Sequence, residues 1–227
     1  MRIATPEYLC AQFFMKGEPV EMCDDLPVVA PSQVHGSEVI RVNAENFSRY
    51  ALPEKPEADG VLLTTSRAGA SLRFADCAPV LLWGSGWAMI LHSGYKGTTL
   101  NITARGLELV GEEFGAAAVR EAHAWIGPCI GREHYCRDIL DEWTQKGLDS
   151  FHAQNFDERA GKIFFDLAGE IHAQLVDAGL SRENITLSGI DTYIDEECYS
   201  YRSGDKTERM TLYIYIKEGS FMHERED

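Results

Sequence analysis

The chain has few basic residues for its size, and this shortage limits its partners. Lysine and arginine together number 21 among 227 residues, whereas aspartate and glutamate number 36, which gives a formal net charge of −15 at pH 7. A field of this sign repels polyanions, so binding to nucleic acid or to an anionic membrane surface is disfavoured. An anionic substrate must then be captured by a local cluster of cations.

Long apolar runs and targeting segments are also missing. No stretch approaches the roughly 18 consecutive apolar residues of a membrane helix, and Met1–Phe14 holds no uninterrupted hydrophobic segment of the signal-peptide kind. The sequence contains no internal repeat, no low-complexity tract and no linker that would separate two domains. These absences predict a single compact domain over residues 1–227 that does not span a membrane and resides in the cytoplasm.

The cysteines form no Cys-x-x-Cys pair, which excludes a zinc ribbon and a thioredoxin-like site. Their even number is compatible with disulfides, but the chain is large and has no export signal, so we expect free thiols. The six cysteines are Cys10, Cys23, Cys77, Cys129, Cys136 and Cys198.

The sequence does contain short apolar runs and amphipathic periods. Asp59–His92 holds three or four apolar runs separated by glycine, proline and serine, which predicts consecutive buried strands. Met210–Ile216 alternates apolar and polar or aromatic residues, the period of a half-buried strand. Together with the expected helices these strands predict an α+β fold of mixed β-sheets packed with helices. The helical periods cover Thr98–Phe114, Asp138–Lys146 and Phe165–Ala178, the last stopping at Gly179.

Three residues at expected turns offer ligands for a metal ion: His35, Cys77 and His92. A catalytic zinc site uses three protein ligands and leaves a fourth position for water or substrate. Two imidazoles and one thiolate match that inventory, and the same residues are the catalytic candidates. The residues alone leave other interpretations open, because a cysteine before an apolar run is often an inert core residue and a histidine often caps a strand or a loop.

Six short strings add information that the three residues lack. In chain order they are Gln33-Val34-His35-Gly36, Glu57-Ala58-Asp59-Gly60, Ala75-Asp76-Cys77-Ala78-Pro79, His92-Ser93-Gly94-Tyr95-Lys96-Gly97-Thr98, Gly127-Pro128-Cys129-Ile130-Gly131 and Tyr199-Ser200-Tyr201-Arg202. In this order they resemble the laccase-domain (YfiH-type) family, whose members are also called multicopper polyphenol oxidases and are described as purine nucleoside phosphorylases.

The resemblance implies a zinc ion, Zn(2+), held by His35, Cys77 and His92. It also implies phosphorolysis of adenosine, inosine or guanosine to the free base and ribose 1-phosphate, with adenosine deamination as a further activity. The expected partners are therefore a small purine nucleoside and phosphate.

Further residues are predicted to contact substrate. Lys96 precedes a helix start, so its ammonium and the helix amides are expected to form one anion site. Arg202 is expected to pair with phosphate or to stack on a ring. Asp76 and Tyr95 neighbour the ligands and, with Asp59, are candidates for the general acid.

The chain departs from the family pattern in its cations. Lys16, a further expected substrate contact, stands where the family has an arginine, and Lys96 replaces another, so a point charge takes the place of a planar bidentate donor. Ser203 replaces an arginine that follows the Tyr-Arg pair. These changes weaken the cationic lining available for phosphate.

Three alternatives compete with the phosphorylase prediction. A cysteine hydrolase would use Cys77 as nucleophile and His92 as base. Copper redox chemistry is disfavoured, because the seven histidines include no His-x-His pair. A non-catalytic binding or peptidoglycan-editing factor is the third alternative, which the Lys16 and Lys96 departures leave open.

Overall fold

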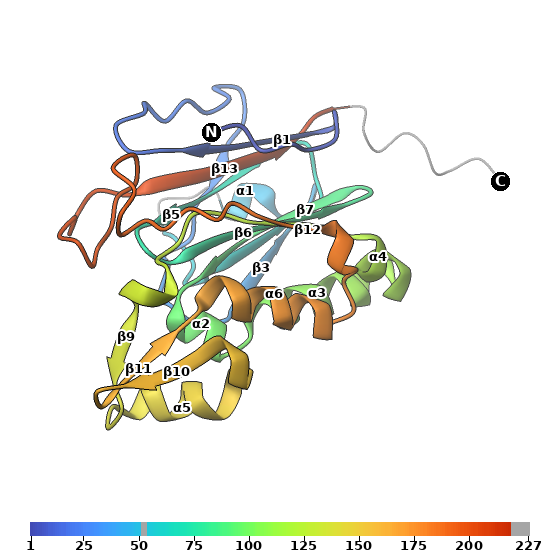
Figure 1. The fold of residues 1–227 in the computed structure, drawn as a ribbon. Helices are drawn as coiled ribbons and strands as arrows, with labels where there is room; N and C mark the ends of the chain where they lie inside the picture. The colour runs from blue at the N-terminus through green and yellow to red at the C-terminus, as the bar shows by residue number, and fades with distance from the viewer. Residues whose placement is uncertain (51–53, 219–227) are drawn as a thin grey trace.

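The computed structural model describes residues 1–50 and 54–218, which fold into two stacked sheets and a layer of helices (Figure 1). The six-stranded sheet has the order β12 (Ile185–Leu187), β8 (His123–Ile126), β6 (Ala78–Gly84), β7 (Trp87–Ser93), β4 (Gly60–Leu63) and β3 (Val39–Val42). The four-stranded sheet has the order β1 (Leu9–Phe14), β13 (Met210–Ile216), β5 (Gly69–Phe74) and β2 (Val28–Val29).

Helices cover the face of the six-stranded sheet that points away from the four-stranded sheet (Figure 1). A small sheet of β10 (Phe156–Arg159), β11 (Lys162–Phe165) and β9 (Cys136–Asp138) packs with one helix at a corner of the molecule. Parallel and antiparallel pairs occur in both large sheets, so the predicted α+β architecture of mixed sheets and helices is confirmed. The helices are α1 (Phe47–Tyr50), α2 (Tyr95–Thr99), α3 (Ile102–Phe114), α4 (Ala116–Glu121), α5 (Glu142–Ser150) and α6 (Leu167–Asp177).

The apolar runs of the 59–92 segment form four strands, β4 to β7, as predicted. β6 and β7 are buried on both faces, because they lie between the other sheet and the helices. In β6, Leu81 packs into the core between the sheets and Leu82 packs into the core beneath the helices. A strand in such a central layer needs apolar residues at consecutive positions, which explains why these runs do not alternate.

The helix expected over residues 98–114 is two helices. Asn101 adopts a left-handed backbone with φ 55°, and its side chain accepts a hydrogen bond from the Ala104 amide, so it caps the start of α3. The single-helix prediction was wrong at this point, because the apolar period continues through a residue that can act as an N-cap. The shorter helix, α2, packs against both β7 and α3.

Three further expectations need correction, one of them only in part. The helix expected over 138–146 is shifted: β9 ends at Asp138, and α5 begins at Glu142 with Asp141 as its cap. β13 is buried on nearly every residue instead of half-buried. The cause is the segment after β1, whose Cys23 amide donates to the Tyr213 hydroxyl on the outer face of β13. α6 ends at Asp177 and is followed by Gly179 with φ 100°, so the predicted stop is confirmed, whereas Phe165, the predicted first residue of this helix, belongs to β11.

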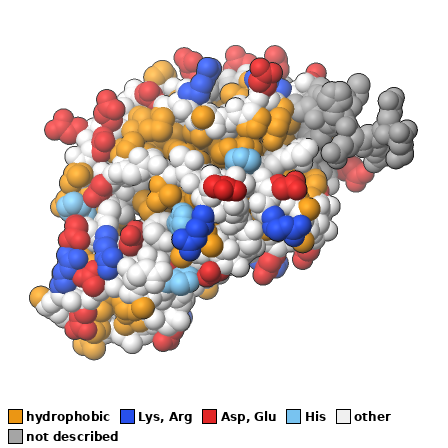
Figure 2. Space-filling model, turned by 45° about the vertical axis from the view of Figure 1, so that its right-hand side comes forward, with side chains coloured by type: hydrophobic (Ala, Val, Ile, Leu, Met, Phe, Trp, Pro, Cys, Tyr) orange, Lys and Arg blue, Asp and Glu red, His pale blue; other side chains and the backbone are white. Residues whose placement is uncertain are grey.

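The surface shows how the acidic net charge is distributed. On the face drawn in Figure 2, lysine and arginine side chains lie among aspartate and glutamate side chains and form no continuous basic surface. Within residues 1–50 and 54–218, no helix has both the length and the apolar character needed to cross a membrane.

Candidate metal centre

His35, Cys77 and His92 converge at one end of the six-stranded sheet. Their ligand atoms, one from each residue, all lie within 4.8 Å of one another. Cys77 directly precedes β6, and His92 lies near the end of the antiparallel neighbour β7, where it pairs with Pro79. The strand register therefore brings the thiol and one imidazole together, and the loop before β3 supplies the other imidazole.

The buried His92 side chain has a defined hydrogen-bond partner. Its Nδ1 lies 2.8 Å from Oδ1 of the fully buried Asp59 carboxylate, and its backbone amide donates to the Asp59 carbonyl at 2.7 Å. Because a carboxylate accepts hydrogen bonds, Nδ1 bears the proton of this contact. The Nε2 atom is then the one that can bind a metal ion.

The loop that contains His35 is closed around the same carboxylate. The Asp59 oxygens accept hydrogen bonds from the backbone amides of Val34 at 3.1 Å, His35 at 3.0 Å and Gly36 at 2.7 Å. His35 adopts a left-handed backbone, with φ 61°, which a residue with a Cβ rarely occupies. Burial alone would raise the pKa of the Asp59 carboxyl, but the bonds from His92, Gly36 and His35 hold it below its usual value.

Asp76 organises the turn on the other side of the centre. It also has a left-handed backbone, with φ 74°, and it directly precedes Cys77. Its carboxylate accepts a hydrogen bond from the Thr192 hydroxyl at 2.8 Å and another from the Arg202 amide at 2.7 Å. One buried carboxylate thus joins the cysteine turn to the loop that contains Arg202.

The charges of Cys77 and His92 stabilise each other in the metal-free protein. Burial would raise the pKa of the Cys77 thiol, but the His92 charge and hydrogen bonds from His35 and His92 lower it to about 6. Burial would also lower the pKa of His92, but the Cys77 charge and the Asp59 hydrogen bond raise it to about 9. Both shifts favour the charged forms, a thiolate and an imidazolium, and the thiolate is the form that binds metals.

The centre is open on one side. His35 is exposed and Cys77 is half-buried, whereas His92 is buried. Gly94 leaves room for the thiol, because a Cβ on that residue would lie 2.5 Å from the Cys77 sulfur. Three ligands with an exposed flank can hold a metal ion and leave a coordination position for a further group.

The lysines predicted to bind substrate lie over aromatic rings. The Lys96 ammonium is 4.8 Å from the centre of the Trp143 ring, and the Lys16 ammonium is 5.4 Å from the centre of the Tyr199 ring. Both contacts are short enough for cation–π attraction. Substrate binding by these lysines stays a prediction.

The Tyr95 hydroxyl is hydrogen-bonded to the protein, whereas most N–H groups of the Arg202 guanidinium are not. The buried Tyr95 hydroxyl donates to the Trp143 carbonyl at 2.8 Å. The Arg202 guanidinium lies 5.1 Å from the centre of the Tyr135 ring and donates to the Cys136 carbonyl at 3.3 Å. In the described part of the chain this is the one hydrogen bond of that guanidinium, so most of its N–H groups are not committed to protein acceptors.

Tyr135 and Arg137 were not among the predicted site residues. Burial raises the pKa of Tyr135 to about 12, and the ring of this residue is the one over which the Arg202 guanidinium lies. Arg137 donates to the Tyr135 hydroxyl at 3.4 Å and to the Asp141 carboxylate at 2.6 Å. The position of Tyr135 just beyond the Gly127–Gly131 string was the available signal for this residue.

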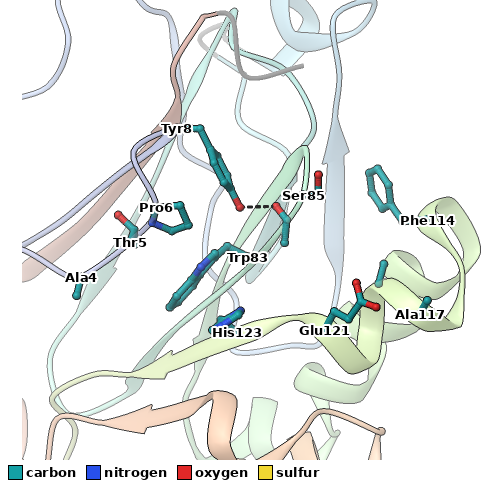
Figure 3. A pocket seen from close by; sticks show the side chains of 12 residues that line it. Ala4, Thr5, Pro6, Tyr8, Trp83, Ser85, Phe114, Ala117, Glu121 and His123 are labelled. Atoms are coloured by element: carbon teal, nitrogen blue, oxygen red, sulfur yellow. Dashed lines mark hydrogen bonds between the residues drawn. The ribbon is translucent and has the colours of Figure 1, made fainter. Parts of the chain in front are cut away.

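A cavity of about 690 Å³ lies at the other end of β6 and β7 (Figure 3). Its walls include Tyr8, Trp83, Phe114, Glu121 and His123, and the Tyr8 hydroxyl donates to the Gly84 carbonyl. None of the predicted site residues lines this cavity. The candidate metal centre and this cavity therefore lie at opposite ends of β6 and β7.

The fold and the centre together define a protein with mixed, stacked sheets and an open site of two imidazoles and one thiol. The sequence profile of the family described as multi-copper polyphenol oxidoreductase laccase matches residues 19–217, and the chain belongs to this family. A relative from Aquifex aeolicus (strain VF5), named purine nucleoside phosphorylase, is 29% identical over 189 residues, which are 83% of this chain and 82% of the relative.

Solved structures give the same result. The crystal structure of the Bacillus licheniformis hypothetical protein YfiH aligns with a TM-score of 0.77 at 26% identity, covering 86% of this chain and 76% of that one. YlmD from Geobacillus stearothermophilus aligns with a TM-score of 0.76 at 25% identity, covering 85% and 74%. The resemblance read from the six strings is confirmed at the level of family and fold.

Proposed function

We propose that this protein is a zinc-dependent purine nucleoside phosphorylase. It would convert adenosine, inosine or guanosine and phosphate into the free base and ribose 1-phosphate. Relatives named purine nucleoside phosphorylase support the substrate class. The observation that most supports the chemistry is the convergence of the ligand atoms of His35, Cys77 and His92 within 4.8 Å, with one flank open.

The donor set fits zinc. Two histidine nitrogens and one thiolate are ligands found in catalytic zinc sites, where a fourth position binds water or substrate. The Asp59 hydrogen bond leaves Nε2 of His92 for the metal, and the lowered pKa of Cys77 supplies a thiolate. When bound, zinc would supply positive charge and Lewis acidity at the open flank.

The residues around the centre supply the remaining positive charge. Phosphorolysis breaks the bond between the purine nitrogen and the anomeric carbon, forms a bond from that carbon to a phosphate oxygen, and leaves the electron pair on the purine. In our proposal Arg202 binds phosphate, because its guanidinium has uncommitted N–H groups in a protein of net charge −15. Lys96 is in α2, which follows β7 and His92, and in our proposal it adds a second cation.

The departing purine must be protonated, and our proposal does not give that role to Asp59, Asp76 or Tyr95. Asp59 accepts four hydrogen bonds and is held ionised, so it has no proton to give. Asp76 accepts two hydrogen bonds, and the Tyr95 proton is donated to a backbone carbonyl. The proton then comes from solvent at the open flank.

Adenosine deamination is the second candidate reaction, and the same open flank favours it. A water molecule would add to the purine ring and ammonia would leave, which requires no phosphate. We place either reaction in the cytoplasm, because the chain has six free thiols and a thiolate ligand, which a reducing compartment preserves.

The test is product analysis with and without phosphate. The zinc-loaded protein is incubated with each nucleoside, and free base, ribose 1-phosphate and inosine formed from adenosine are measured by chromatography. We expect phosphate-dependent release of base and equal amounts of ribose 1-phosphate, and no conversion by His92→Ala. Conversion no greater than that of the His92→Ala control would reject both reactions.

A further inference from the structure

We propose that Asp59 is a positioning residue that holds two of the three metal ligands at once. Its carboxylate fixes the His92 side chain directly and fixes His35 through the backbone of the loop around it. The proposal rests on the proposed zinc centre, but it concerns metal binding and not the reaction catalysed there.

All of the acceptor capacity of the Asp59 carboxylate is used by these two segments. Oδ1 accepts from the His35 amide at 3.0 Å and from His92 Nδ1 at 2.8 Å. Oδ2 accepts from the Val34 amide at 3.1 Å and from the Gly36 amide at 2.7 Å. A carboxylate has about four lone-pair sites, and the side chain is fully buried, so Asp59 has no free acceptor for a substrate.

The His35 loop depends on this carboxylate for its shape. Three consecutive amides point at one anion, an arrangement that a neutral acceptor stabilises far less. The φ of 61° at His35 is a strained conformation for a residue with a Cβ, and such strain persists only where the surroundings impose it. Without the carboxylate, the three amides lose their acceptor and the imidazole loses its fixed direction.

The His92 side chain depends on the same group for its tautomer. A proton on Nδ1, donated to Oδ1, leaves Nε2 unprotonated and directed at the metal. The backbone of Asp59 is itself anchored, because its amide donates to Glu38 at 3.0 Å and its carbonyl accepts from the His92 amide at 2.7 Å. The carboxylate is therefore held by two strands and is a rigid reference point for both ligands.

Asp59→Asn separates this role from simple packing, because it conserves volume but replaces one acceptor oxygen by a donor NH₂. If the NH₂ faces Val34 and Gly36, it opposes two amide donors. If it faces His92, it favours the tautomer with a proton on Nε2, which cannot bind the metal. In either orientation one ligand is misplaced.

The experiment measures the zinc dissociation constant by competition with a chromophoric chelator, together with the thermal midpoint of each metal-free protein. We expect Asp59→Asn to weaken zinc binding 10- to 100-fold, the usual loss for an outer-shell partner. Asp166→Asn is the matched control, because Asp166 caps α6 through the Gly169 amide and contacts none of the ligands. Because asparagine caps a helix about as well as aspartate, this variant should keep both its thermal midpoint and its zinc affinity close to those of wild type.

A double-mutant cycle with His35→Ala tests the claim that two ligands are held. If Asp59 acts through both histidines, the fold loss caused by Asp59→Asn will be smaller when His35 is already absent. Zinc affinity of Asp59→Asn within threefold of wild type would overturn the proposal. An equal fold loss in both backgrounds would also overturn it, because Asp59 would then act through His92 alone.

A measurement on the wild-type protein avoids dependence on the folding of the variant. In the zinc-loaded protein, nitrogen spectra of labelled histidine should show His92 protonated at Nδ1 and metal-bound at Nε2. Binding through Nδ1 would overturn the proposal. If zinc binding behaves as expected but no nucleoside is converted, the proposed function fails while the role of Asp59 stands.

Discussion

Gly94 shows how a single residue without a side chain determines whether the centre can form. A Cβ at this position would lie 2.5 Å from the Cys77 sulfur and 3.5 Å from a carbon of the His35 ring. We predict that Gly94→Ala displaces the thiol and weakens zinc binding by about 1–3 kcal/mol, the usual range for overpacking a tight site. Chelator competition measures this change.

The control for Gly94 is Gly111→Ala in α3. A Cβ there would have its nearest neighbour, in Val119, at 3.6 Å, an ordinary contact. Because alanine is the better helix former, this variant should be slightly more stable and bind zinc normally. Wild-type zinc affinity in Gly94→Ala would contradict the geometry described for the centre.

Cys77 distinguishes the metal site from the alternative cysteine hydrolase. In the metal-free protein, iodoacetamide should alkylate Cys77 rapidly at pH 7.5, because the thiol of this residue has a pKa of about 6. Cys129 and Cys198 should react slowly, because burial raises the pKa of both thiols. Stoichiometric zinc should protect Cys77. Mass spectrometry of tryptic peptides measures both. Rapid alkylation of Cys77 in the presence of saturating zinc would favour the nucleophile.

The sequence was informative about these residues to different degrees. His35, Cys77 and His92 were predicted from the order of six family strings, and the structure brings them together. Their types and spacing alone did not predict this convergence, because it depends on the pairing of β6 with β7 and on a loop from before β3. The four hydrogen bonds of Asp59 had no local signal either, since three of their donors are backbone amides.

At the scale of elements, strand types were easier to predict than helix ends. The uninterrupted apolar runs of β6 and β7 follow from burial on both faces, so they were visible in the sequence. The break at Asn101 was not visible, because asparagine is compatible with a helix interior and with a cap. The burial of β13 could not be predicted from its alternation, because a distant segment around Cys23 covers its outer face.

The loop that contains Arg202 is joined to the metal-binding turn through Asp76, and this joint can be tested. Asp76→Ala removes the acceptor for the Thr192 hydroxyl and for the Arg202 amide. We predict a roughly tenfold higher KM for phosphate, equivalent to about 1.4 kcal/mol, with zinc still bound. Steady-state kinetics and metal analysis of the same sample measure the two quantities.

Asp76→Asn is the matched control for that prediction. Asparagine tolerates the left-handed backbone, its carbonyl can still accept from the Arg202 amide, and the Thr192 hydroxyl can rotate to accept from the NH₂. Its KM should stay near that of wild type. Unchanged KM in Asp76→Ala would show that Asp76 does not position Arg202 for phosphate.

His152 joins the turn before β10 to α6 and should make stability depend on pH. Hydrogen bonds to the buried Glu170 raise the pKa of His152 above its usual value of about 6.5. Because the pKa of His152 is higher in the folded than in the unfolded state, protonation of this residue stabilises the fold. The stabilisation is fully present below about pH 6.5 and is lost as the pH rises through the folded pKa. The advantage of wild type over His152→Gln, on the order of 0.5 kcal/mol for a partly exposed pair, should therefore shrink between pH 6 and pH 8.5.

Thermal unfolding of both proteins across this range measures the effect. His172→Gln is the control, because burial lowers the pKa of His172, and the sign of its pH dependence should be opposite. A constant difference between wild type and His152→Gln would show that the pair with Glu170 is not coupled to protonation.

At the scale of the whole molecule, the fold explains how one site can be built from distant segments. The pairing of β6, β7 and β4 in one sheet brings His92 on β7, Cys77 before β6 and the His35 loop together at one end. Solved structures share this fold, with TM-scores of 0.76 and 0.77. Lys16, Lys96 and Ser203 depart from the family pattern and are not among the three candidate ligands, so they are expected to alter substrate affinity before metal binding.

The central claim is that His35, Cys77 and His92 bind one zinc ion with an open position, and X-ray absorption at the zinc edge tests it most directly. The purified protein should contain one zinc per chain, with one sulfur at about 2.3 Å and nitrogen or oxygen neighbours at about 2.0–2.1 Å. In Cys77→Ser the sulfur contribution should disappear. A protein that binds no zinc, or a zinc without a sulfur neighbour in wild type, would contradict the account.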